Sequence, residues 1–229
     1  MRISSVVASP VVVSQFGTSR KPVVAKKVTG QQALTQRERT VIHEFGHAIW
    51  GLLLEKRLLG IDIDNDREGN AYSYTQKSTN KDDKARYDAI ELIHNLGGIS
   101  FEENMALSSR VQRSKKKHQN PVYVDVIEKG DSDIESIFTL LKPYKGFKNN
   151  EQISDLIVAT LASMADLFNK INKDNLLMLT MEIPNVVVGH KTLKKLTNEI
   201  IDHRQFETYK RKQVAKLLDT LTQSLIDAR

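Results

Sequence analysis

Two histidines and a glutamate stand at a spacing that suits metal chemistry. His43, Glu44 and His47 form the pattern His-Glu-x-x-His within the segment from Arg37 to Lys56. On an α-helix, residues four positions apart lie one turn apart on the same face, so both imidazoles can bind one metal ion. The glutamate beside the first histidine can reach a water molecule on that ion. The pattern therefore predicts a metal site with Glu44 as its general base.

The residues around the pattern favour a buried helix. From Glu38 to Ile49 there is no proline, and Gly46 is the only glycine. Buried polar groups are costly unless they have partners, and a metal ion would be a partner for both histidines. The alternative is a pair of histidines at helical spacing that bind no metal. Apolar residues recur at spacings of three and four, namely Val41, Ile42, Phe45, Ala48, Ile49, Leu52 and Leu53.

The composition limits the ligands and the class of protein. The 229 residues are 40% hydrophobic and 27% charged, which suits one globular domain with an appendage. The absence of cysteine excludes disulfides, thiolate ligands and a cysteine nucleophile. The net charge of +6 is mild and does not require a nucleic acid. No apolar stretch approaches the roughly 18 residues of a spanning helix. We expect a cytoplasmic protein with no transmembrane segment and no nucleic-acid partner.

The first 35 residues differ from the rest of the chain. They are rich in Ser, Val and Thr, and no acidic residue precedes Glu38. We expect a flexible basic leader over 1–35 and the main domain over 36–229. A leader of this composition also resembles an organelle transit peptide, which is the alternative for localisation.

The remaining pattern predicts a mainly α fold (α+β) with a small β-hairpin near the metal helix. The hairpin is expected over Leu58 to Gln76. His94 is expected to be a satisfied core residue of the next helix. The other expected elements are a helix over Asp82 to Leu107 that is broken or bent at Gly97-Gly98, a strand at 122–126, a helix that opens at 129–133 and runs to about Leu141, a long helix from Glu151 to about Met181, a break between Pro184 and Gly189, and C-terminal helices over Lys191 to Asp202 and Gln205 to Ala228.

The pattern needs a third ligand from farther along the chain. A catalytic zinc usually has three protein ligands and one open position. The metzincin pattern would place glycine at position 50 and histidine at position 53, but the chain has Trp50 and Leu53. That family is therefore excluded, and the third ligand is expected to be a carboxylate or a histidine elsewhere.

Several segments resemble a known family. The stretch from Arg39 to Ile49 resembles the zinc-binding helix of FtsH-type peptidase domains, the proteolytic part of membrane-bound AAA proteases. The stretch from Leu96 to Glu103 is similar to that family's Leu-Gly-Gly-Arg-Ala-Ala-Glu-Glu segment, with the Arg and Ala positions changed. The regions 153–181 and 189–196 resemble its closing helices.

The resemblance implies a zincin-like helical peptidase domain that holds Zn2+ and hydrolyses peptides or unfolded proteins. The family's ATPase domain and membrane helices are not encoded in this sequence, so the activity is expected to be ATP-independent. A homo-oligomer or a separate ATPase partner is also implied.

In that family an aspartate at a helix start completes the metal site. Asp133 lies in the right order, before the closing helices. The sequence around Asp155 matches the family's motif better. If Asp155 were the ligand, however, too little chain would remain for those helices. Glu102, Glu103 and Asp131 are further alternatives. An aspartate at a helix start is also favoured by the helix dipole without any metal.

Three functions are compatible with these residues. The first is a zinc-dependent metalloendopeptidase with His43, His47 and Asp133 as metal ligands. The second is a regulatory metalloprotein of the ImmA/IrrE kind, with a ligand near Glu102 and Glu103. The third is a non-catalytic scaffold domain that keeps the helix for structure.

Overall fold

Helix α1 (Gln36–Leu53) carries the His-Glu-x-x-His pattern, as predicted. The computed structural model describes residues 34–64, 68–74, 81–110 and 132–229. The leader up to residue 33 and the strand expected at 122–126 lie outside these ranges. A capping box starts α1, because the Thr35 hydroxyl accepts from the Glu38 backbone N–H while the Glu38 carboxylate accepts from the Thr35 N–H.

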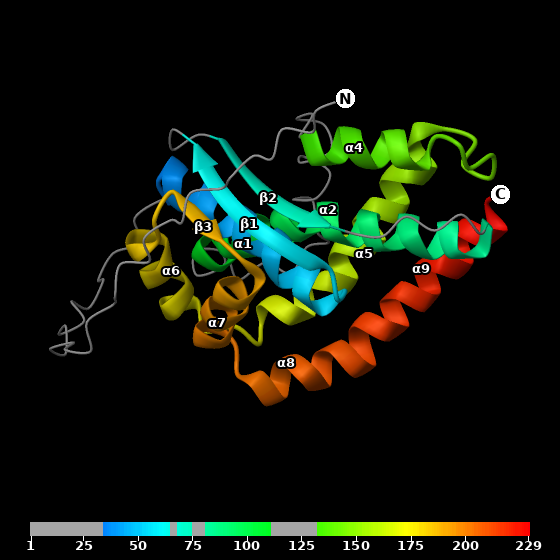
Figure 1. Ribbon diagram of the computed structural model, residues 1–229. Coiled ribbons are helices and arrows are strands. Elements are labelled where there is room, and N and C mark those ends of the chain that lie inside the picture. The colour runs from blue at the N-terminus through cyan, green and yellow to red at the C-terminus, as the bar shows by residue number, and fades with distance from the viewer. Residues whose placement is uncertain (1–33, 65–67, 75–80, 111–131) are drawn as a thin grey trace, which may run out of the picture. The chain divides into compact units, whose positions relative to one another are not determined.

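The sheet has three antiparallel strands in the order β2-β1-β3. The predicted hairpin is confirmed as β1 (Arg57–Asp64) and β2 (Glu68–Tyr74). Strand β3 (Val186–Val188) pairs with the other edge of β1, in the segment predicted only as a break. Three residues are too short to give an alternating pattern, so the sequence carried no signal for it. The sheet lies over α1 (Figure 1).

Helix α2 (Lys81–Arg110) runs without interruption through Gly97 and Gly98, so of the predicted alternatives, a break or a bend, the break is wrong. The two glycines serve the contact with α1 instead. A Cβ atom at Gly46 of α1 would lie 2.4 Å from the Gly97 carbonyl oxygen. The two helix backbones therefore touch directly, which only residues without a side chain permit.

Helix α4 (Ser132–Leu141) confirms the predicted helix that ends at Leu141. The single long helix predicted over 151–181 is wrong, because the structure has α5 (Asn150–Phe168) and α6 (Lys173–Glu182). Asn172 explains the second start, since its side chain accepts from the backbone N–H of Asn175 as an N-cap.

The C-terminal region is helical, as predicted. It contains α7 (His190–Ile200), α8 (His203–Tyr209), the π-helix η2 (Lys210–Val214) and α9 (Ala215–Asp227). The last three follow one another as a single curved helix (Figure 1).

The segment Ala33–Arg229 forms one compact unit around an apolar core. Helix α1 lies at its centre, with Phe45 and Trp50 fully buried. The mainly α fold with a small sheet beside the metal helix is confirmed. Among the residues that the structure describes, no helix combines the length and apolarity that a bilayer-spanning segment requires.

Candidate metal centre

The side chains of His43, His47 and Asp133 converge on one point. The histidines project from α1, and the aspartate stands in the first turn of α4. Asp133 Oδ2 lies 2.9 Å from His43 Nε2 and 3.0 Å from His47 Nε2. The two Nε2 atoms lie 3.1 Å apart. The three residues form a group that can hold a metal ion.

The spacing of these atoms fits a transition-metal ion. Tetrahedral zinc has bonds of about 2.0–2.2 Å to nitrogen and oxygen, which places its ligand atoms about 3.3–3.5 Å apart. The three observed distances are slightly shorter, so a small outward movement of the side chains would admit an ion. Two imidazoles and one carboxylate also leave a coordination position open for water or substrate. The donor set suits zinc and other divalent transition metals.

Each histidine is oriented by a partner on its far nitrogen. His43 Nδ1 lies 3.3 Å from Glu102 Oε2, and His47 Nδ1 lies 2.8 Å from the backbone carbonyl oxygen of His94. When Nδ1–H donates to these oxygens, each Nε2 keeps a lone pair for a metal. Sequence reasoning treated Glu102 only as an alternative ligand and did not foresee the carbonyl of His94.

Comparison with known proteins finds no matching family model, no matching curated protein and no matching solved structure.

The charges of His43, Asp133 and Glu102 act on one another. Burial favours the neutral form of His43, but its hydrogen bonds to Asp133 and Glu102 outweigh burial and raise its pKa to about 10. Burial would raise the pKa of Asp133, but its hydrogen bonds to the two histidines lower it below its usual range. A proton on the His43 imidazole therefore occupies the place that a cation would take.

Glu44 lies beneath strand β2. Its side chain is buried, and a Cβ atom at Gly69 would lie 2.7 Å from Glu44 Oε1. The strand passes over the glutamate this closely only because position 69 has no side chain. Glu44 thus stands between the metal helix and the start of β2.

Gly98 makes room for the imidazoles from the side of α2. A Cβ atom there would lie 2.5 Å from His43 Nε2 and 2.7 Å from His47 Nε2. Any larger residue would enter the position of the metal ligands. The Gly-Gly pair therefore has two roles, since Gly97 admits the backbone of α1 and Gly98 admits its histidines.

The other candidate ligands that the structure describes lie outside the group. Asp155 is exposed on α5, and Glu102 contacts the far nitrogen of His43. Glu103 is not a member of the metal group, and Asp131 lies outside the described residues. His94 is buried and outside the group, in agreement with its prediction as a core residue.

Proposed function

We propose that this protein is a zinc-dependent metalloendopeptidase. The observation that carries the proposal is the meeting of His43, His47 and Asp133 at one point, with Glu44 on the same helix. A zinc ion bound there would lower the pKa of a water molecule and polarise a peptide carbonyl. Asp133 lies in the first turn of α4, and both histidines lie on the buried helix α1. All three candidate ligands are therefore carried by helices rather than by loops.

Glu44 is the proton carrier of the proposed reaction. It accepts the proton of the attacking water and then delivers this proton to the leaving amine. Its burial beneath β2 keeps bulk water from competing for the carboxylate. Glu102 acts through His43, which it holds with Nε2 toward the metal.

Strand β2 supplies a place for the substrate. One side of β2 pairs with β1, and β2 is the terminal strand of the sheet in the described residues. An extended peptide that pairs with the edge of β2 opposite β1 would lie next to Glu44, because Gly69 belongs to this strand. Such binding suits peptides and unfolded segments, which can adopt an extended conformation. A separate ATPase partner, which could unfold proteins, would extend the range to folded substrates.

The decisive variant is Glu44→Gln, which keeps the size of the side chain and removes its basicity. Hydrolysis of a fluorogenic unfolded protein should fall by at least about 100-fold, as expected for loss of a general base. The zinc content, measured by mass spectrometry, should stay at the wild-type value. Glu182→Gln, on the exposed surface of α6, is the matched control and should retain full activity.

Two outcomes would contradict the proposal. Equal activity of wild type and Glu44→Gln would mean that the cleavage does not use this site. A zinc-loaded wild type without activity on any unfolded protein or peptide would favour the non-catalytic scaffold.

A further inference from the structure

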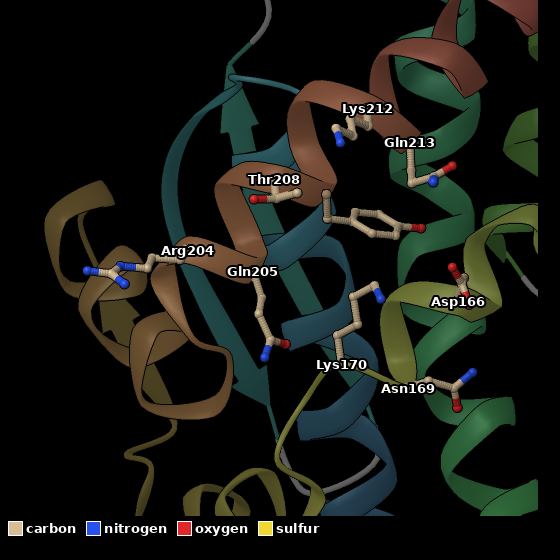
Figure 2. A pocket seen from close by; sticks show the side chains of 9 residues that line it. Asp166, Asn169, Lys170, Arg204, Gln205, Thr208, Lys212 and Gln213 are labelled. Carbon is tan, nitrogen blue, oxygen red and sulfur yellow. The ribbon is translucent and has the colours of Figure 1, made fainter.

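A cavity lies beside the C-terminal helix, and no member of the metal group lines it. It has a volume of about 520 Å³, within the range of small-molecule sites. One wall comes from the end of α5 and the turn after it, and the other from one face of α8 and η2 (Figure 2). The lining residues are Asp166, Asn169, Lys170, Arg204, Gln205, Thr208, Tyr209, Lys212 and Gln213.

The lining carries an excess of positive charge. Lys170, Arg204 and Lys212 supply three cations, whereas Asp166 is the single carboxylate. Within the described part of the chain, none of the three cations forms an ion pair with a carboxylate. Figure 2 shows Lys170 reaching from the α5 side into the space between the two walls. A concave surface with one dominant sign of charge concentrates counter-ions.

The helical wall contains a rare element. The π-helix η2 supplies Lys212 and Gln213 to the lining. π-Helical turns are frequent at functional sites, because the extra residue redirects side chains. Tyr209, the residue before η2, is buried and belongs to the lining of the cavity. Burial and the nearby charge of Asp166 raise the pKa of Tyr209 to about 12.

We propose that this cavity binds a small phosphorylated molecule. Lys170 comes from the wall formed by the end of α5 and the turn after it, and Lys212 comes from the helical wall; both bind phosphate oxygens as charge-assisted donors. The side-chain amides and the Thr208 hydroxyl of the lining bind the uncharged polar groups of the ligand. This site is independent of the proposed peptidase activity.

The cavity is connected to the metal helix by a ring contact. Tyr209 packs edge-on against Trp50 of α1, with ring centroids 6.2 Å apart. Lys210 adds an ion pair of 2.8 Å to Glu55, just after the end of α1. Trp50 is the only tryptophan of the chain. A ligand that contacts Tyr209 should therefore change the fluorescence of this single tryptophan.

The experiment uses inorganic pyrophosphate as the probe and the full-length protein. Binding is followed by Trp50 fluorescence and by calorimetry. The wild type should bind pyrophosphate in a saturable manner. The double variant Lys170→Glu with Lys212→Glu should bind it at least about tenfold more weakly, since two charge-assisted hydrogen bonds are replaced by repulsion.

Two further variants distinguish binding in the cavity from binding elsewhere on the protein. Lys194→Glu with Lys195→Glu makes the same charge change on the exposed face of α7, outside the cavity, and should bind like the wild type. His47→Ala removes a metal ligand, and pyrophosphate binding should persist in it. Retained binding by His47→Ala would show that pyrophosphate binds in the cavity and not at the metal centre.

Three results would overturn the proposal. They are the absence of saturable binding to the wild type, an equal loss in both double variants, and a loss confined to His47→Ala. The first means that the cavity takes no phosphate, the second that the attraction is a general charge effect, and the third that pyrophosphate binds at the metal centre. A failed peptidase assay would affect none of these readouts.

Discussion

Asp133 Oδ2 lies 2.9 Å from His43 Nε2, although 90 positions separate the two residues in the chain. Helix α4 brings the aspartate to α1, and its buried residues Ile134, Ile137 and Leu141 fix it to the core. The contact completes a three-residue metal group that neither helix could form alone.

The first prediction concerns metal content. Purified wild type should hold about one zinc ion per chain, as a three-ligand site requires. His47→Ala and Asp133→Asn should lose it, because each removes one of three ligands. Asp155→Asn, with the same chemical change on the exposed face of α5, should keep it. Native mass spectrometry measures the zinc content of the wild type and of the three variants. Loss of zinc in Asp155→Asn with retention in Asp133→Asn would reverse the assignment of the third ligand.

The second prediction is that metal binding releases a proton. The pKa of His43 is raised to about 10 in the metal-free protein, so its imidazole is protonated at neutral pH. A metal ion must displace this proton, and its affinity should increase about tenfold per pH unit between pH 7 and 9. Calorimetry in buffers of different ionisation enthalpy counts the protons. A pH-independent affinity over this range would show that His43 is already neutral.

The third prediction is the pH dependence of stability without metal. The raised pKa of His43 means that its contribution is fully present below pH 6.5 and is lost as the pH rises toward about 10. The lowered pKa of Asp133 means that its contribution is present above pH 3.8 and is lost as the pH falls. The Tm difference between metal-free wild type and Asp133→Asn should therefore be largest between pH 3.8 and pH 6.5. A difference that does not shrink from pH 6.5 to pH 10 would contradict the ion pair.

The fourth prediction assigns a positioning role to Glu102. Glu102→Gln should weaken zinc binding by about 10- to 100-fold, because the carboxylate that orients His43 is lost. Glu103→Gln is the matched control and should bind zinc like the wild type. Competition with a fluorescent chelator measures both affinities. Complete loss of zinc in Glu103→Gln alone would instead favour the ImmA/IrrE-like ligand set.

The fifth prediction distinguishes the glycines of the helix contact. Gly98→Ala places a Cβ atom 2.5 Å from His43 Nε2 and should reduce metal affinity more than stability. Gly46→Ala places a Cβ atom 2.4 Å from the Gly97 carbonyl oxygen and should cost at least about 2 kcal/mol of stability, as overpacking against a rigid backbone does. Denaturant unfolding and metal titration of both variants check this. Similar effects of the two substitutions on both measurements would contradict the division of roles.

The sequence alone determined the metal helix. The spacing of His43 and His47 is local, and an apolar repeat of three and four residues defines the helix that carries them. The hairpin and the C-terminal helices were predictable for the same reason, since their patterns repeat over enough residues to be distinctive. Strand β3 and the break at Asn172 depend on few residues, so neighbouring elements and a single cap decided them.

Only the tertiary structure decided what surrounds the two histidines. The sequence left Asp133, Asp155, Glu102, Glu103 and Asp131 as competing ligands, because spacing along the chain does not say which of them reaches α1. It also could not distinguish a helix break at Gly97-Gly98 from a helix contact, since glycine suits both. Packing answers the question about the glycines, and it brings Asp133 to both histidines as the candidate third ligand. The close approach of α1 and α2 requires those glycines, and the core contacts of α4 place one carboxylate against both Nε2 atoms.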